Sequence, residues 1–275
     1  MRGRNRVLLS PLFVALLGIV FIVPFVFIVL TAAKTRVEAG QLEFSLPTEW
    51  ALLENLSDAI KARNYMLIAA FINSFILTVA SVAIMVVLSA MVGYVLQRRK
   101  SRWTRVADLV ILSGLIIPPA IVPTVWVLQQ LGLFKTLPGL ILIEVAFGMS
   151  FCILLFRAFI ATIPRELDEA ATIDGAGPLR VFFSVIFPLL RSVTVTVIVT
   201  QSVFVFNDFV NPLYFLPGDE NATVQLTLFN FQSQYNTQYN LLFADILLIT
   251  IPPIIMFMFF NRKIVAGLTA GAVKG

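Results

Sequence analysis

The 275-residue sequence contains no histidine, and this absence bears on several classes of function. Histidine is the commonest general base and proton shuttle, and it is a frequent metal ligand. The chain also has a single cysteine, Cys152, which lies in an apolar run. Neither a disulfide framework nor a cysteine-based metal site can therefore form within one chain. These absences argue against a catalytic or metal-binding protein, and we expect no metal and no cofactor.

Charged residues are also scarce, at 13% of the chain, whereas hydrophobic residues make up 59%. A soluble domain usually has about 25% charged and about 45–50% apolar residues. This contrast excludes an ordinary soluble globule. It also excludes low-complexity disorder, which requires low hydrophobicity. The composition therefore predicts a polytopic membrane protein.

Long apolar runs give the number of expected membrane spans. A spanning helix needs about 20 apolar residues, because the hydrocarbon core is about 30 Å thick and each residue rises about 1.5 Å. Six stretches meet or approach this length: 7–33, 66–96, 107–128, 137–160, 181–206 and 241–260. Prolines interrupt the third and sixth, which membrane helices tolerate because neighbouring helices satisfy the freed backbone groups. We therefore expect an all-α fold with six transmembrane helices in one domain, residues 1–275, and a first span retained as a signal anchor.

The basic residues predict an orientation. Fifteen of the 20 Lys and Arg residues fall on one side of the predicted spans, including Arg2, Arg4, Arg6 and the run from Arg98 to Arg105. The other side holds five: Lys34, Arg36, Lys61, Arg63 and Lys135. By the positive-inside rule, both termini are expected on the cytoplasmic face of a bacterial or archaeal-type plasma membrane. The net charge of +5 is thus attributed to topology and the lipid bilayer, not to nucleic-acid binding.

The segment 161–192, between the fourth and fifth spans, predicts a short cytoplasmic helix. Pro164 suits a first turn, and the acidic residues that follow complement the positive end of the helix dipole. Gly175 and Gly177 are expected to supply a left-handed stop. The helix would present four residues at helical spacing: Leu167, Ala170, Ala171 and Asp174. Such a helix is either a capped connector or a docking element for a cytoplasmic partner.

The same segment carries a resemblance to a known family. Glu169-Ala170-Ala171, then Gly175, then Val185-Ile186-Phe187-Pro188 resembles the EAA loop of membrane subunits of binding-protein-dependent ABC importers. The chain looks most like a carbohydrate-type permease of the maltose-permease group. Further matches are Asn73-Ser74, Tyr94 with Arg98, Ile173-Asp174-Gly175-Ala176 and the tail 267–275, which resembles that of the second permease subunit.

The resemblance implies partners and roles. It implies a second permease subunit, an ATP-binding cassette subunit dimer, an extracytoplasmic solute-binding protein and a carbohydrate substrate. Residues that would form or shape the contact with the ATPase are Glu169, Ala170, Ala171, Asp174, Gly175 and Pro188. Residues of the cytoplasmic tail, 261–275, that would reach the nucleotide subunits are Gly271, Lys274 and Gly275. The chain lacks the phosphate-binding G-x-x-x-x-G-K-[ST] motif, so a separate subunit is expected to hydrolyse ATP.

Substrate contacts are expected among polar residues within the spans, because such residues are costly in a membrane. The candidates for the substrate path are Asn73, Glu144, Phe206, Asn207, Asp208 and Asp245, with Phe204, Phe209 and Trp126 as further aromatic surfaces. Each polar residue could instead serve packing or bonding between subunits. Two positions depart from the family pattern: Phe206 replaces the tryptophan that commonly precedes Asn-Asp, and Ser192 replaces a second proline.

Three other functions remain as alternatives. The same machinery could import a phosphorylated polyol or an amino-sugar. An ATP-independent secondary transporter would show buried charge pairs or an inverted repeat, and neither is visible in the sequence. An intramembrane enzyme is disfavoured by the lack of histidine and of a paired carboxylate motif.

Overall fold

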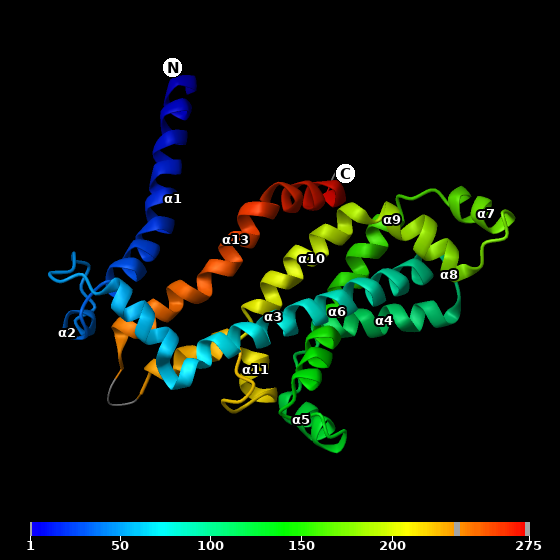
Figure 1. Cartoon of the computed structure of the whole chain (residues 1–275). Coiled ribbons are helices and arrows are strands. Elements are labelled where there is room, and N and C mark those ends of the chain that lie inside the picture. The colour runs from blue at the N-terminus through cyan, green and yellow to red at the C-terminus, as the bar shows by residue number, and fades with distance from the viewer. Residues whose placement is uncertain (1, 234–236, 273–275) are drawn as a thin grey trace. The chain divides into compact units, whose positions relative to one another are not determined.

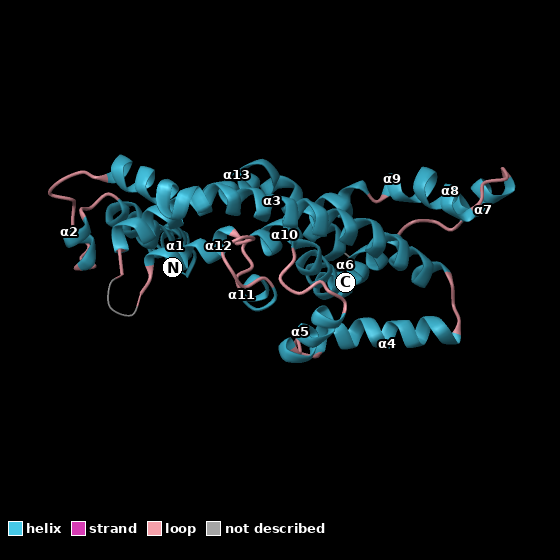
Figure 2. Cartoon of the chain, turned by 60° about the horizontal axis from the view of Figure 1, so that its bottom comes forward, coloured by secondary structure: helices cyan, strands magenta, loops and turns pink. Residues whose placement is uncertain are grey.

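The computed structural model describes residues 2–233 and 237–272, and every regular element in those ranges is a helix (Figures 1 and 2). The first six helices are α1 (Arg2–Ala32), α2 (Arg36–Gly40), α3 (Leu52–Arg98), α4 (Arg102–Ile116), α5 (Ile121–Gln130) and α6 (Leu137–Ile160). The next group is α7 (Glu166–Ile173), α8 (Pro178–Arg180), the π-helix η1 (Val181–Ile186), α9 (Phe187–Leu189) and α10 (Arg191–Phe206). The last are α11 (Val210–Phe215), α12 (Val224–Thr227), the 3-10 helix η2 (Leu228–Phe231) and α13 (Tyr239–Ala272).

The chain separates into two compact units. Unit 1 comprises residues 1–70 and 224–251, and unit 2 comprises residues 71–223 and 252–275. The two long helices α3 and α13 each contribute to both units. Each unit is described by itself below.

Several helices are long and apolar enough to cross a membrane. Three qualify singly: Leu52–Arg98, Leu137–Ile160 and Tyr239–Phe260. Two bent pairs raise the number to five if each pair counts as one span. Leu16–Ala32, within α1, is apolar but shorter. The described chain is therefore a helical protein with three to five candidate spans, as expected for a polytopic membrane protein.

The bent pairs correspond to the third and fifth predicted spans. α4 and α5 meet at 116° around Pro118-Pro119, where proline removes a backbone donor and disfavours helix in the preceding residue. Pro178–Leu189 and Arg191–Phe206 meet at 78°, and the break falls at Leu190, whose ψ is 5°. The stretch 181–206 was predicted as one span, whereas the structure turns the chain within it.

The part of α3 in unit 1 is also interrupted. Residues Ala62–Tyr65 leave the helical conformation, and Arg63, Asn64 and Tyr65 all have positive φ. The kink separates a short helical segment, which begins at Leu52, from the long apolar run that begins at Met66. This agrees with the expected start of the second span near residue 66.

Unit 1 has a polar cluster where α1 ends. Lys34 is buried, and its Nζ donates to the Glu43 carbonyl at 2.6 Å and to Ser45 Oγ at 2.9 Å. Asn55 Nδ2 donates to the carbonyls of Ala32 and Lys34, both at 2.8 Å, and Asn55 Oδ1 accepts a hydrogen bond from Asn240 Nδ2 at 2.7 Å. Buried polar groups require such partners. The cluster fixes the end of α1 against α3 and α13 within this unit.

The core of unit 2 is built around α6. Leu140, Cys152, Phe156 and Ile160 of this helix have no exposed surface. Gly93 of α3 allows a close approach, because a Cβ there would lie 3.2 Å from both the Arg157 nitrogen and Phe156 Cβ. The absence of a side chain at Gly93 thus permits α3 to pack tightly on α6. This pairing supports the segment that follows α6.

Candidate functional site

The helix α7 lies in the connection after α6, where the sequence predicted it. Its first turn carries Glu166, Asp168 and Glu169, which favour the positive end of the helix. It ends in a Schellman motif: the Ala176 N–H donates to the Ala171 carbonyl and the Gly175 N–H to the Thr172 carbonyl, both at 3.0 Å. Gly175 has φ +79°, as expected for the left-handed stop. Gly177 has φ −69°, so it does not share this role.

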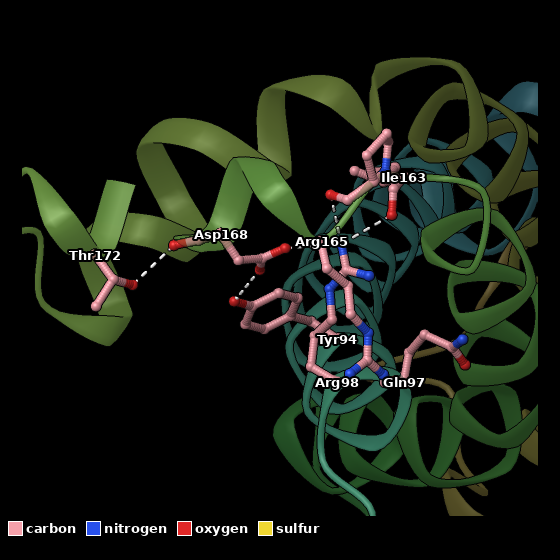
Figure 3. A network of polar contacts seen from close by, with 8 residues as sticks. Tyr94, Gln97, Arg98, Ile163, Arg165, Asp168 and Thr172 are labelled. Atoms are coloured by element: carbon pink, nitrogen blue, oxygen red, sulfur yellow. Dashed lines mark hydrogen bonds and ion pairs between the residues drawn. The ribbon is translucent and has the colours of Figure 1, made fainter. Parts of the chain in front are cut away.

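A polar network joins α7 to the end of α3 (Figure 3). The Tyr94 hydroxyl donates to Asp168 Oδ1 at 2.5 Å, and Arg98 Nη2 pairs with Asp168 Oδ2 at 2.8 Å. Arg98 Nη2 also donates to the Ile163 carbonyl at 3.1 Å. The Arg98 and Asp168 side chains are only 11% and 15% exposed. The pair is therefore largely shielded from water, where it holds its geometry better than a surface ion pair does.

A second set of contacts supports the same connection. Arg165 Nη2 donates to the Gln97 carbonyl at 3.3 Å, and Arg157 of α6 pairs with Asp108 of α4. Sequence reasoning noted Tyr94 and Arg98 only through the family resemblance, and it assigned Asp168 to the helix dipole. No spacing in the sequence indicates that residues 74 positions apart meet, so their network could be found only from the fold.

The outer face of α7 and the segment after it expose apolar side chains. Ile173 is 86% exposed and Leu179 is 65% exposed. Glu169, Ala170 and Asp174 are exposed beside them, whereas Ala171 is half-buried and packs on the core of unit 2. Exposed apolar side chains grouped on a short polar helix are typical of a surface covered by a partner.

The remaining residues of the predicted coupling set lie nearby or outside this face. Pro188 is exposed in the first positions of α9, immediately before the 78° bend. Gly271 lies in α13, where the backbone is helical. Lys274 and Gly275 lie outside the described residues.

The structure brings three of the predicted polar residues of the substrate path together at the end of α10. Glu144 lies beside Asp208, and Asn211 Nδ2 donates to Glu144 Oε1 at 3.2 Å. Asp208 Oδ1 accepts from the backbone N–H groups of Val210 and Asn211 at 2.8 and 3.3 Å. Asn207 precedes this group and donates from Nδ2 to the Val203 carbonyl at 2.8 Å. Asn211 was not predicted, although it lies only four residues beyond Asn207 in the sequence.

A hollow of about 610 Å³ opens beside these residues. Aromatic rings line it together with Asn207 and Asp208; these rings belong to Phe204, Phe209 and Phe257. Phe206, which was predicted for the path, is only 8% exposed and lies in the core instead. Phe204 and Phe209 had been considered as aromatic surfaces, and both line the hollow. Trp126 is exposed on α5 and does not line it.

Two other predicted path residues are held elsewhere. Asn73 Nδ2 donates to the Ala222 carbonyl at 3.1 Å within unit 2. Asp245 is fully buried in unit 1, where Thr227 Oγ1 donates to its Oδ2 at 2.8 Å. Among the described residues, no group of three or more His, Cys, Asp and Glu side chains is placed to hold a metal ion.

Comparison with known proteins gives the family. Residues 86–269 match the family model described as the binding-protein-dependent transport system inner membrane component. The chain is 33% identical over 262 residues to the probable starch degradation products transport system permease protein AmyC of Thermoanaerobacterium thermosulfurigenes, covering 94% of this chain and 93% of that protein. It is 30% identical over 267 residues to the melibiose/raffinose/stachyose import permease protein MelC of Bacillus subtilis, covering 96% and 95%.

A solved structure supports the fold. The chain resembles the crystal structure of a bacterial ABC transporter involved in import of the acidic polysaccharide alginate, with a TM-score of 0.83 and 19% identity, covering 95% of this chain and 98% of that one. At this identity the likeness concerns the fold alone. Taken with the sequence matches and the apolar helices, it leads to one conclusion: the chain belongs to the family of binding-protein-dependent transport system inner membrane components, and is a non-catalytic, multi-pass permease subunit of an ABC importer.

Proposed function

We propose that this permease imports a carbohydrate delivered by an extracytoplasmic solute-binding protein, and that α7 is the helix through which a separate ATPase subunit drives it. The proposal rests mainly on one observation: α7 has an exposed outer face and is also bonded to a membrane helix. Its outer face exposes Ile173 and Glu169, whereas Asp168 on the same helix is tied to Arg98 of α3. A helix that is open to a partner and fixed to a membrane helix can transmit movement from one to the other.

The membrane topology that we propose has six spans and both termini in the cytoplasm. The five candidate spans and α1 together make six. The asymmetry of basic residues supports a cytoplasmic location for the α3–α4 and α6–α10 connections. α7 then faces the compartment that contains ATP. The family resemblance also assigns Gly271, Lys274 and Gly275 of the tail, 261–275, to contacts with the nucleotide subunits.

The coupling follows from these connections. ATP binding favours the closed arrangement of the nucleotide subunits, and the docked α7 moves with them. Asp168 and Arg98 pass this displacement to α3, and the helices α8 to α9 pass it to α10. The importer shifts its population from inward-facing to outward-facing because ATP and the loaded binding protein bind the two states with different affinities. The energy source is the partner's ATP hydrolysis.

The hollow at the end of α10 is the proposed contact with the substrate. Phe204 and Phe209 present ring faces on which the apolar face of a sugar can stack, and Asn207 and Asp208 offer partners for hydroxyl groups. The charged side chain lining the hollow is Asp208, and Glu144 lies against it. Negative charge opposes a phosphorylated polyol but accepts a neutral sugar or an amino-sugar. The names of the relatives, which refer to starch degradation products and to melibiose, raffinose and stachyose, support a sugar.

Co-expression with the neighbouring transport genes tests the proposal. The purified complex is expected to contain an ATPase subunit and to hydrolyse ATP faster when the loaded binding protein is added. Glu169→Lys reverses a charge on the docking face and is expected to abolish this stimulation and sugar uptake. Glu220→Lys, an exposed charge reversal far along the chain from α7, serves as the matched control. A complex that lacks an ATPase, or one in which Glu169→Lys leaves uptake intact, contradicts the assignment.

A further inference from the structure

A second hollow lies in unit 2 at the α3–α4 connection, apart from the hollow beside Asp208. Its volume is about 650 Å³. The basic side chains that line it are Arg99, Lys100, Arg102, Arg105, Arg157 and Arg165. The floor includes the buried Leu96, and the first turn of α4 forms one wall. The α3–α4 connection lies at the same end of unit 2 as α7 (Figure 1).

The charge in this hollow is strongly unbalanced. Asp108 is its only acidic lining residue, and it already pairs with Arg157. Arg165 is directed to the Gln97 carbonyl. In the part of the chain that the structure describes, Arg99, Lys100, Arg102 and Arg105 form no ion pair. Four cations within one concave site repel one another unless an anion joins them.

The helix α4 adds an apolar surface that starts at this hollow. Trp103 is 71% exposed in the first turn, and the Arg102 guanidinium lies 5.9 Å from the centre of its ring. Val106 and Val110 follow at helical spacing and are also exposed, with Leu109 beside them. A tryptophan next to basic residues at the end of an apolar helix is typical of the membrane–water interface. The basic hollow and the apolar stripe are thus continuous on one helix.

We propose that this hollow binds the phosphate headgroup of an anionic phospholipid, whose acyl chains lie along Trp103, Val106 and Val110. Arginine suits a phosphate group because its planar donors bind two oxygens at once. The inference rests on the proposed orientation, which places the hollow in the negatively charged cytoplasmic leaflet. A soluble phosphate could satisfy the cations, but it would leave the adjoining apolar stripe without a role. An acidic segment of the ATPase subunit would likewise not explain that stripe.

Native mass spectrometry of the purified importer complex tests the site. The complex is released from nanodiscs that contain either phosphatidylglycerol with phosphatidylcholine or phosphatidylcholine alone, and the retained lipids are counted. We expect phosphatidylglycerol to be retained by the wild-type complex. The double variant Arg102→Gln/Arg105→Gln is expected to weaken retention by about twenty-five-fold, since each of the two cations at an anionic surface contributes roughly fivefold. Arg180→Gln/Arg191→Gln removes the same charge from exposed positions outside the hollow and should retain the lipid.

Further measurements distinguish a phospholipid from the other possible ligands of this hollow. Inorganic phosphate at millimolar concentration should not displace the phospholipid; displacement would show that the site takes a soluble anion instead. Equal retention by the wild-type complex and Arg102→Gln/Arg105→Gln would overturn the proposal, as would a cross-link from this hollow to the ATPase subunit. ATP hydrolysis stimulated by the binding protein in phosphatidylcholine alone is the independent readout. Stimulated ATP hydrolysis without lipid retention would overturn the lipid site alone. A lack of stimulated ATP hydrolysis under all conditions would count against the proposed function.

Discussion

Asp168 has a different part in α7 from the acidic residues around it. Glu166 and Glu169 are exposed, whereas Asp168 is largely buried between Tyr94 and Arg98. This single side chain links the short helix to the end of α3. Because charged hydrogen bonds are stronger than neutral ones, its loss should loosen α7 more than the loss of a neighbouring carboxylate.

Asp168→Asn is expected to destabilise α7 locally by about 2 kcal/mol, because the Arg98 guanidinium loses a charged partner in a shielded position. Hydrogen–deuterium exchange should show faster opening of α7 amides, roughly thirtyfold, in the assembled complex. Sugar uptake per ATP hydrolysed should fall. Glu166→Gln is the matched control and should leave both quantities near wild type. Unchanged exchange in Asp168→Asn would mean that the network does not hold the helix.

Phe204→Ala tests the hollow beside Asp208. Loss of a ring face is expected to raise the KM for sugar uptake by about three- to tenfold, as estimated from the energy of aromatic contacts, without affecting assembly with the ATPase. Phe151→Ala removes an exposed ring of α6 that lies outside the hollow. A similar rise in KM for both variants would show that the effect is general and not specific to the hollow.

Residue-level prediction from the sequence was uneven for physical reasons. Glu144, Asn207 and Asp208 stand out as costly polar groups in apolar surroundings, so they could be identified without a fold. The same reasoning could not decide whether Phe204 or Phe206 lines the hollow beside Asp208. They lie two positions apart on α10, and the packing alone turns one into the hollow and buries the other in the core.

At the scale of elements, the loop after α7 depends on one backbone position. Gly175 has φ +79°, in the left-handed region, and a Cβ there would meet no atom within 4 Å. Any free-energy cost of a side chain at this position therefore comes from the backbone conformation. It does not come from a clash with neighbouring elements. Gly177 is equally open but has φ −69°, so it offers a matched comparison.

Gly175→Ala is expected to destabilise the end of α7 by about 1 kcal/mol, because the left-handed conformation is unfavourable for residues with a Cβ. Gly177→Ala should be neutral or stabilise the segment by about 0.5 kcal/mol, through a less flexible unfolded chain. Exchange at the Ala176 amide, which closes the Schellman motif, measures both. The idea fails if the two variants shift this exchange equally.

The sequence predicted helices better than it predicted their directions. The range 137–160 coincides with α6, because an uninterrupted apolar run has one favourable conformation in a membrane. Pro118-Pro119 indicated an interruption between α4 and α5 in the sequence. The 116° angle between these two helices depends on tertiary packing and could not be predicted. The 78° turn at Leu190 was not anticipated, since Pro188 is compatible with a continuing span in the sequence alone.

At the scale of the whole molecule, family membership and composition agree on a multi-pass inner-membrane permease. The orientation of the chain in the membrane is inferred from the uneven distribution of basic residues along the sequence. The positions of the helices alone do not indicate it. The number of spans needs both, because α1 and the two bent pairs are each ambiguous by length. The described structure thus limits the number of possible membrane spans, and the distribution of basic residues supports the proposed orientation of those spans.

Single-cysteine labelling in intact cells tests that direction. The native Cys152 is fully buried, so its thiol gives little background. Leu46→Cys, exposed in the connection between α2 and α3, should react with a membrane-impermeant maleimide. Thr162→Cys, exposed two residues after the end of α6, should react only after the membrane is permeabilised. The reverse pattern would contradict cytoplasmic termini.

The most direct test of the central claim is a cross-link from α7 to the ATPase. Ile173→Cys places an accessible thiol on the exposed face of this helix, and Ile116→Cys places a comparably exposed one at the end of α4. After attachment of a photoreactive thiol reagent, irradiation of the co-expressed complex should join Ile173→Cys, but not Ile116→Cys, to the ATPase subunit. The yield should change when ATP is bound. No cross-link from Ile173→Cys, or an equal yield from both positions, would contradict the role of α7 as the coupling helix.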